Sequence, residues 1–255
     1  MNLPLAPAFS HELITTPHGR IAYVRQNGRD PGVMFLHGFN SDMQGGKATA
    51  LAEYCAARDQ AFVRFDCRAH GQSEGAFEDF TIGGALEDAL YVLDHLTEGP
   101  QILVGSSMGG WLAFLLALVR PERVRAIIGL APAPDFTDQI YFDDFNDAQR
   151  AELDAKGHIR LPSQYGGEYL ITQNLITDGR RHFVMDRLGD ITCPLRIIHG
   201  QEDADVKWEQ SLEVAKRWGG NDVQVSLIKA GNHRLSEPSD LLLLRHTLSQ
   251  LLEAP

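Results

Sequence analysis

A serine between glycines at residues 105–109 has the surroundings of a catalytic nucleophile. The stretch reads Gly-Ser-Ser-Met-Gly and stands between an apolar run and a helix-like segment, the context of a G-x-S-x-G nucleophile elbow. The glycine frame favours Ser107, because Ser106 would need glycines at the positions of Val104 and Met108. The alternative is a tight turn with a structural role only.

A serine nucleophile needs a base, and the base needs an acid behind it. Among the ten histidines we expect His233 to be the base, because it follows the last expected strand and precedes the final helix. Asp203 is the expected acid, three residues after Gly200, which ends the preceding strand. Asp205 is its rival, since it could equally cap the next helix, and Glu202 is a third candidate.

Two backbone N–H groups are expected to stabilise the oxyanion that forms during acyl transfer. One belongs to Met108, which follows the nucleophile at a helix N-terminus. The other belongs to Phe39 in the stretch HGFNSD, residues 37–42, where a buried strand ends. His37 is expected to be structural rather than a base. This chemistry requires no metal or cofactor, and the three cysteines show no metal-binding spacing.

Short β-type runs alternate with helix-length segments along most of the chain. This alternation predicts an α/β protein with a mostly parallel, doubly wound sheet. Functional side chains of such a sheet gather at the carboxyl ends of its strands. Strands are expected at 20–25, 32–38, 61–67, 101–106, 124–132, 194–200 and 223–231, and helices at 48–59, 84–96, 108–119, 207–218 and 239–253.

The alternation is interrupted between residues 134 and 188, a segment called the cap below. Aromatic residues, acidic residues and glycines are scattered there without a strand pattern, which indicates a short helical insertion over one edge of the sheet. Residues 1–255 then form a single domain, with a core of residues 1–133 and 189–255. Phe142 and Tyr169 are candidates for binding the substrate, and simple packing of the cap is the alternative for each of its aromatic residues.

These motifs resemble those of the α/β-hydrolase family over nearly the whole chain, including the order Ser, Asp, His. More narrowly, the chain is similar to the mitochondrial serine hydrolases that remove S-palmitoyl groups from proteins and cleave acyl glucuronides. The resemblance implies the α/β-hydrolase fold, with Ser107 as nucleophile, Asp203 as acid and His233 as base. It is carried by SDMQGGKA (41–48), RFD (64–66), GPQILVGSSMGGWL (99–112), CPLRIIHGQED (193–203), VKW (206–208) and HR (233–234).

The predicted function is hydrolysis of carboxylic esters or thioesters through an acyl-enzyme, with a medium or long acyl chain. The expected substrate is a small-molecule ester or acyl-thioester, or an S-acylated protein. Three alternatives stay open: hydrolysis of carbon–carbon bonds by the same triad, a non-catalytic ligand-binding module on this fold, and an interaction protein with a relic site. The sequence carries no signal for an oligomeric state.

Composition and charge disfavour several kinds of partner. The net charge of −11 argues against nucleic acid and against anionic membrane surfaces. No apolar run reaches the ~18 residues of a membrane span, so no stable membrane insertion is expected. The three cysteines are far apart and the chain shows no secretory signal, which favours a reducing compartment, and we therefore expect a cytoplasmic protein.

Overall fold

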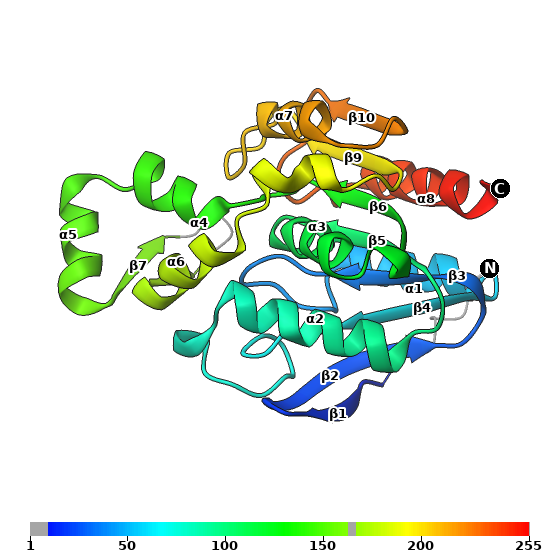
Figure 1. Cartoon of the computed structure of the whole chain (residues 1–255), viewed down its shortest axis with the longest axis horizontal. Coiled ribbons are helices and arrows are strands. Elements are labelled where there is room, and N and C mark those ends of the chain that lie inside the picture. Colours follow the sequence, from blue (N-terminus) through cyan, green and yellow to red (C-terminus); the bar gives the residue numbers. More distant parts are fainter. Residues whose placement is uncertain (1–9, 163–166, 255) are drawn as a thin grey trace.

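A computed structural model describes residues 10–162 and 167–254 and shows a sheet of eight strands between two layers of helices (Figure 1). The strand order is β1-β2-β4-β3-β5-β6-β9-β10. β2 pairs antiparallel with both β1 and β4, and the remaining pairs are parallel. The strands are β1 (Glu12–Thr16), β2 (Gly19–Gln26), β3 (Arg29–Leu36), β4 (Gln60–Phe65), β5 (Gln101–Ser106), β6 (Val124–Leu130), β9 (Leu195–Gly200) and β10 (Val223–Ile228).

The central strands bury side chains on both faces, as their continuous apolar runs predict. In β3, Val33 and Phe35 pack with residues of α1 and α8, whereas Met34 and Leu36 pack with residues of α2 and α3. The helices of the core are α1 (Gly46–Ala56), α2 (Ile82–Leu96), α3 (Met108–Val119), α7 (Glu209–Arg217) and α8 (Pro238–Glu253). None of the helices in the described residues is both long and apolar enough to cross a membrane.

The predicted α/β architecture is confirmed, and every strand and helix expected in the core overlaps an observed one. Two expectations about strands are wrong. β1 was not expected; it is an antiparallel edge strand whose pairing depends on the turn that leads into β2. The cap is not free of strands either, because β7 (His158–Pro162) and β8 (Glu168–Thr172) form an antiparallel pair.

The cap leaves the sheet after β6 and returns before β9, and Figure 1 shows it extending beyond the sheet on one side. Besides β7 and β8 it contains α4 (Phe136–Gln139), a π-helical turn (Ile140–Asp144), α5 (Asp147–Lys156) and α6 (Gln173–Gly179). Each of the two strands has only five residues, and β8 ends in three consecutive buried residues instead of alternating, which explains why periodicity alone missed the pair.

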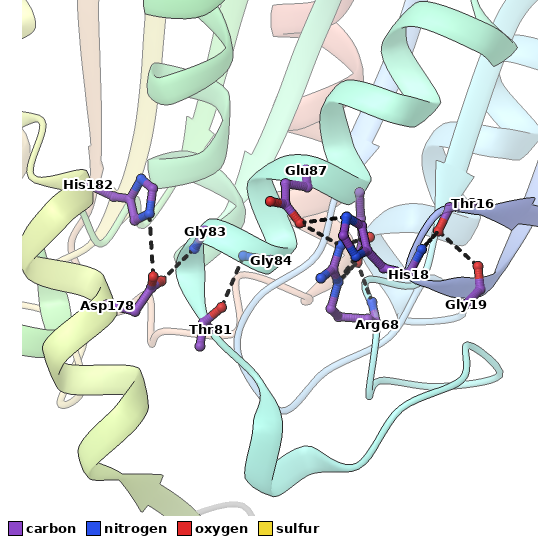
Figure 2. Close-up of polar contacts among 11 residues, drawn as sticks. Thr16, His18, Gly19, Arg68, Thr81, Gly83, Gly84, Glu87, Asp178 and His182 are labelled. Atoms are coloured by element: carbon purple, nitrogen blue, oxygen red, sulfur yellow. Dashed lines mark hydrogen bonds and ion pairs between the residues drawn. The ribbon is translucent and has the colours of Figure 1, made fainter.

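Polar contacts hold the cap to the N-terminus of α2, as Figure 2 shows. The carboxylate of Asp178 accepts a hydrogen bond of 2.7 Å from the N–H of Gly83 and lies 3.6 Å from Nε2 of His182. The indole N–H of Trp111 donates to the carbonyl of His182 at 3.0 Å. Because an anionic side chain at a helix N-terminus is stabilised by the helix dipole, Asp178 is a favourable anchor there.

The two ends of the cap are joined by the side chain of Asp135. Its two carboxylate oxygens accept the backbone N–H groups of Val184 (2.8 Å) and Met185 (3.1 Å). Asp135 itself has a left-handed backbone, with φ of 57°. Burial raises the pKa of this carboxyl to about 6, although the two backbone N–H donors lower it.

Stability is therefore expected to depend on pH through Asp135. The folded protein binds this proton more tightly than the unfolded chain, so this group's contribution to the free energy of unfolding falls as the pH rises from about 4 to about 6. The amide in Asp135→Asn cannot titrate. The free energy of unfolding of this variant minus that of the wild type should therefore increase between about pH 4 and about pH 6, by at most about 3 kcal/mol. Urea unfolding of both proteins at about pH 4.5 and about pH 7 measures this. A difference between them that stays constant with pH would contradict the expectation.

Candidate active site

Ser107 occupies a strained turn between β5 and α3. Its backbone has φ of 54° and ψ of −118°, a conformation that costs a residue with a side chain about 1–3 kcal/mol. A Cβ atom on Gly105 would lie 2.2 Å from the carbonyl oxygen of Gly109, and one on Gly109 would lie 2.1 Å from that of Leu36. Only glycine fits at either position, which is why the motif needs both.

The two adjacent serines differ in their surroundings. Ser106 is the last residue of β5, and its side chain is buried. Ser107 is partly exposed at the start of α3, where its N–H donates to the carbonyl of Leu130 at 2.9 Å. The turn thus presents Ser107 to solvent while Ser106 stays in the sheet.

The loop after β3 approaches Ser107 closely. A Cβ atom on Gly38 would lie 3.3 Å from Cβ of Ser107 and 3.9 Å from its Oγ, so the peptide that carries the N–H of Phe39 lies beside the hydroxyl. Met108 is the first residue of α3, and its N–H therefore has no acceptor within the helix. These two N–H groups are the sequence-predicted oxyanion donors, and both lie next to Ser107.

Two buried histidines hold this loop through backbone hydrogen bonds. Nε2 of His37 accepts the N–H of Cys67 at 3.0 Å, and Nε2 of His70 accepts the N–H of Asn40 at 3.2 Å. Each ring can accept there only while it is neutral. Burial lowers the pKa of both rings, for His70 to about 4, so both stay neutral near pH 7. His37 is structural, as expected, whereas His70 was not expected to have a role.

His233 and Asp203 form a short hydrogen bond at the ends of two neighbouring strands. Nδ1 of His233 lies 2.7 Å from Oδ2 of Asp203, whose side chain is fully buried. β9 and β10 are parallel neighbours, and the residues that follow them approach so closely that a Cβ atom on Gly200 would lie 2.1 Å from the carbonyl oxygen of Gly231. This close approach brings the loop of the aspartate to the loop of the histidine.

Asp203 remains ionised because it accepts four hydrogen bonds. The backbone N–H groups of Asp205 (2.9 Å) and Val206 (2.8 Å) donate to Oδ1. Burial by itself would raise the pKa of this carboxyl, but the hydrogen bonds from His199 and His233, the charge of His233 and the N–H of Val206 together hold it well below its usual range. The carboxylate is thus available as a fixed negative charge.

The two alternative candidates for the acid, Asp205 and Glu202, have different surroundings from Asp203. Asp205 donates its backbone N–H to Asp203, and its own Oδ2 is buried without a hydrogen-bond partner among the described residues. Glu202 is exposed. Ligand atoms of Asp203, Asp205 and His233 lie within 4.8 Å of one another. Since both oxygens of Asp203 are already saturated by N–H donors, this group suits a hydrogen-bonded triad better than a metal ion.

Sequence reasoning also missed His199. Its Nε2 lies 3.0 Å from Oδ2 of Asp203, and its side chain is fully buried. The available signal was its position in the stretch HGQED, four residues before the aspartate and on the strand that leads into the loop of the aspartate.

One cavity of about 930 Å³ brings these groups together. Ser107, Asp203 and His233 all line it, although no hydrogen bond joins Ser107 to His233 in the part of the chain that the structure describes. Catalytic hydrogen bonds are often long in a site without substrate and tighten when it binds. The cap supplies an apolar wall formed by Phe136, Ile140, Leu161, Tyr169 and Ile171.

The two candidate substrate-binding residues of the cap lie in different places. Tyr169 lines the cavity, and its ring lies 6.2 Å from that of Phe39. It is paired across the β7–β8 strands with Leu161, so the alternation of this pair directs both toward the cavity. Phe142 does not line the cavity: 58% of it is exposed, and the guanidinium of Arg180 lies 5.3 Å from its ring. The π-helical turn places Ile140 at the cavity and leaves Phe142 outside it.

Comparison with known proteins identifies the family of this chain. The sequence model of a family described as alpha/beta hydrolase fold matches residues 31–165. A mouse protein named palmitoyl-protein thioesterase ABHD10, mitochondrial, is 41% identical over 235 residues, which cover 91% of this chain and 79% of the mouse protein. The resemblance inferred from the motifs is therefore confirmed.

Two solved structures have the same fold over nearly the whole chain. Alpha/beta hydrolase domain-containing protein 10 from mouse has a TM-score of 0.89 at 39% identity and covers 96% of this chain and 98% of its own. A putative hydrolase from Agrobacterium vitis S4 has a TM-score of 0.90 at 35% identity and covers 96% of this chain and 99% of its own.

The expected cytoplasmic location is wrong by the same comparison. The mouse relative is named mitochondrial, which points away from the cytoplasm. Unpaired cysteines were the main support for the expectation, and they indicate only that a compartment keeps thiols reduced. They do not identify which compartment it is.

Proposed function

Because this chain belongs to the α/β-hydrolase family, we propose that it hydrolyses acyl thioesters and esters through Ser107, His233 and Asp203. One observation carries the proposal: the 2.7 Å hydrogen bond between His233 and Asp203 lies in the wall of the cavity into which the strained turn presents Ser107. The names of the mouse and rat relatives support the thioester, since both are called palmitoyl-protein thioesterase.

The reaction begins when Oγ of Ser107 attacks the acyl carbonyl carbon and His233 takes the hydroxyl proton at Nε2. Asp203 accepts the hydrogen bond from Nδ1, which keeps the other ring nitrogen free to act as the base, and its charge stabilises the imidazolium. The imidazolium then protonates the leaving thiolate or alkoxide. A water molecule then attacks the acyl-enzyme while His233 takes its proton, and the imidazolium returns this proton to Oγ of Ser107 as the bond between the acyl carbon and Oγ breaks and the carboxylic acid is released.

The negative charge that develops on the carbonyl oxygen is placed between two backbone N–H groups. These are Phe39 on the loop after β3 and Met108 at the N-terminus of α3. The helix dipole adds to the second donor. Loss of one donor of this kind typically raises the barrier by about 3–4 kcal/mol.

The acyl chain is proposed to lie along the apolar wall that the cap contributes. The volume of the cavity, about 930 Å³, is near the upper end for ligand pockets, which suits an extended acyl chain better than an acetyl group. We propose in addition that residues 134–188 act as a cap within a single domain of residues 1–255. The acyl donor would be a small thioester or ester, or an S-acylated protein.

The identity of the nucleophile is tested by covalent labelling. A fluorophosphonate should add once to the wild-type protein, because only a hydroxyl activated by a base attacks phosphorus rapidly. Intact-mass spectrometry should show that the adduct is lost in Ser107→Ala and kept in the matched variant Ser106→Ala. Labelling that persists in Ser107→Ala would overturn the assignment.

The role of the acid is tested with two neighbouring aspartates. Asp203→Asn should lower kcat by about four orders of magnitude, because an amide cannot stabilise the required tautomer and the imidazolium. Asp205→Asn keeps the backbone N–H that Asp205 donates to Asp203, so its kcat should fall much less. Steady-state kinetics with a p-nitrophenyl ester measures both. The reverse order of effects would make Asp205 the acid.

Chain-length preference tests the acyl wall. From acetyl to hexanoyl esters, which adds four methylenes, kcat/KM should rise by up to about two orders of magnitude if the chain stays bound in the transition state. Tyr169→Ala should flatten this profile, because Tyr169 lines the cavity. Phe142→Ala is the matched control, since this exposed ring lies outside the cavity, and it should leave the profile unchanged. A flat profile in the wild type would mean that the cap does not bind the chain.

A further inference from the structure

A buried histidine that the proposed mechanism does not use touches the triad acid. His199 lies in β9, one residue before its end, and its side chain is fully buried. Its Nε2 lies 3.0 Å from Oδ2 of Asp203 and 3.1 Å from the carbonyl oxygen of Val206. Its Nδ1 lies 2.6 Å from Oγ of Ser211 on α7.

The partners of His199 determine where its proton sits. Both neighbours of Nε2 are acceptors, so Nε2 carries the proton and donates it. Nδ1 then accepts the hydroxyl proton of Ser211, which keeps the ring in this tautomer. The result is a buried chain of hydrogen bonds that runs from Ser211 through His199 to Asp203.

Two imidazole rings therefore donate to the same carboxylate oxygen. Oδ2 of Asp203 accepts from Nδ1 of His233 at 2.7 Å and from Nε2 of His199 at 3.0 Å. Oδ1 accepts two backbone N–H groups and cannot exchange roles with Oδ2 without breaking them. A second donor on Oδ2 fixes the direction of the carboxylate and also takes part of the negative charge that would otherwise face His233.

We propose that His199 is a positioning residue of the triad, which holds Oδ2 of Asp203 against His233 and limits how strongly this carboxylate attracts the proton of the base. The proposal rests on the proposed function, since it assumes that His233 is the base. It assigns to Ser211 the separate task of fixing the His199 tautomer.

Other charged groups also face Asp203 and its neighbours. Lys47, at the start of α1, interacts electrostatically with Asp203, with Arg234 and with Asp240 of α8, and Asp205 lies beside Asp203 on the same loop. Burial, more than the neighbouring charge of Arg234, lowers the pKa of Lys47 to about 8. The effect of His199 must therefore be measured on the acid limb of the pH profile, below about pH 7, where Lys47 stays charged.

Two amide substitutions provide a matched pair. In His199→Gln the side-chain amide NH₂ reaches the place of ring Nε2 and can donate to both Asp203 and Val206. In His199→Asn the shorter amide reaches only the place of Nδ1, beside Ser211, and leaves Oδ2 of Asp203 without this donor. Both are compared with the wild type by kcat/KM against pH, with a p-nitrophenyl ester, and by thermal unfolding.

For His199→Asn the acid limb should move to higher pH by about half a unit to one unit, because the carboxylate then favours the imidazolium more strongly. Its kcat should fall about tenfold with little change in KM, as expected for one lost charge-assisted hydrogen bond. His199→Gln should restore the wild-type limb even where it melts at a lower temperature than the wild type.

An acid limb that stays at the wild-type position in folded His199→Asn would overturn the proposal. So would an equal shift in both variants, since the retained donor would then have no effect. Ser107→Ala is assayed in parallel, so that a failure of the role proposed for His199 can be told from a failure of the proposed function. Ester hydrolysis that survives in Ser107→Ala would refute the proposed function itself, whatever the His199 variants show.

Discussion

The active site depends on how closely backbone can approach backbone at two pairs of strand ends. Gly109 brings α3 against the carbonyl of Leu36, and Gly105 brings β5 against the same helix, with no room for a methyl group at either position. At the other pair, Gly200 and Gly231 bring the loops after β9 and β10 together. Without these contacts, Ser107 and His233 would not line one cavity, because the strands that lead to them would lie too far apart.

Two neutral histidines stabilise the loop after β3 through hydrogen bonds. His37 and His70 accept backbone N–H groups around the loop after β3, and burial keeps them uncharged. An uncharged imidazole can satisfy backbone groups in a place where a lysine or a carboxylate would bring an unpaired charge. The two histidines thus hold the loop after β3 without adding a charge of their own, whereas the negative charge of Asp203 is compensated by N–H donors.

Parts of the site with a local cause could be predicted from the sequence, and parts set by distant contacts could not. Ser107 follows from the glycine frame, since the strain and the close approach are properties of five consecutive residues. Asp203 and Asp205 cannot be separated by spacing, because both follow the same strand and the choice depends on which side chain meets His233. His70 was missed because its contact with Asn40 joins residues 30 positions apart. Phe142 was misplaced because the aromatic content of the cap does not indicate which side of the segment each ring lies on, and Phe142 is two residues from Ile140, on nearly the opposite side of the helical turn.

The base of the cap has a consequence for how such proteins acquire new specificities. The carboxylate of Asp135 joins the chain where it leaves the sheet to the chain where it comes back, through the N–H groups of Val184 and Met185. The chain between these points is a segment with fixed ends, and lengthening such a segment costs little entropy. A different segment grafted at the same two points would also have to replace the bonds that the present cap makes with the core, among them Asp178 to Gly83 and His182 to Trp111. These few anchoring contacts, rather than the length of the segment, therefore limit which linings the same core can accept.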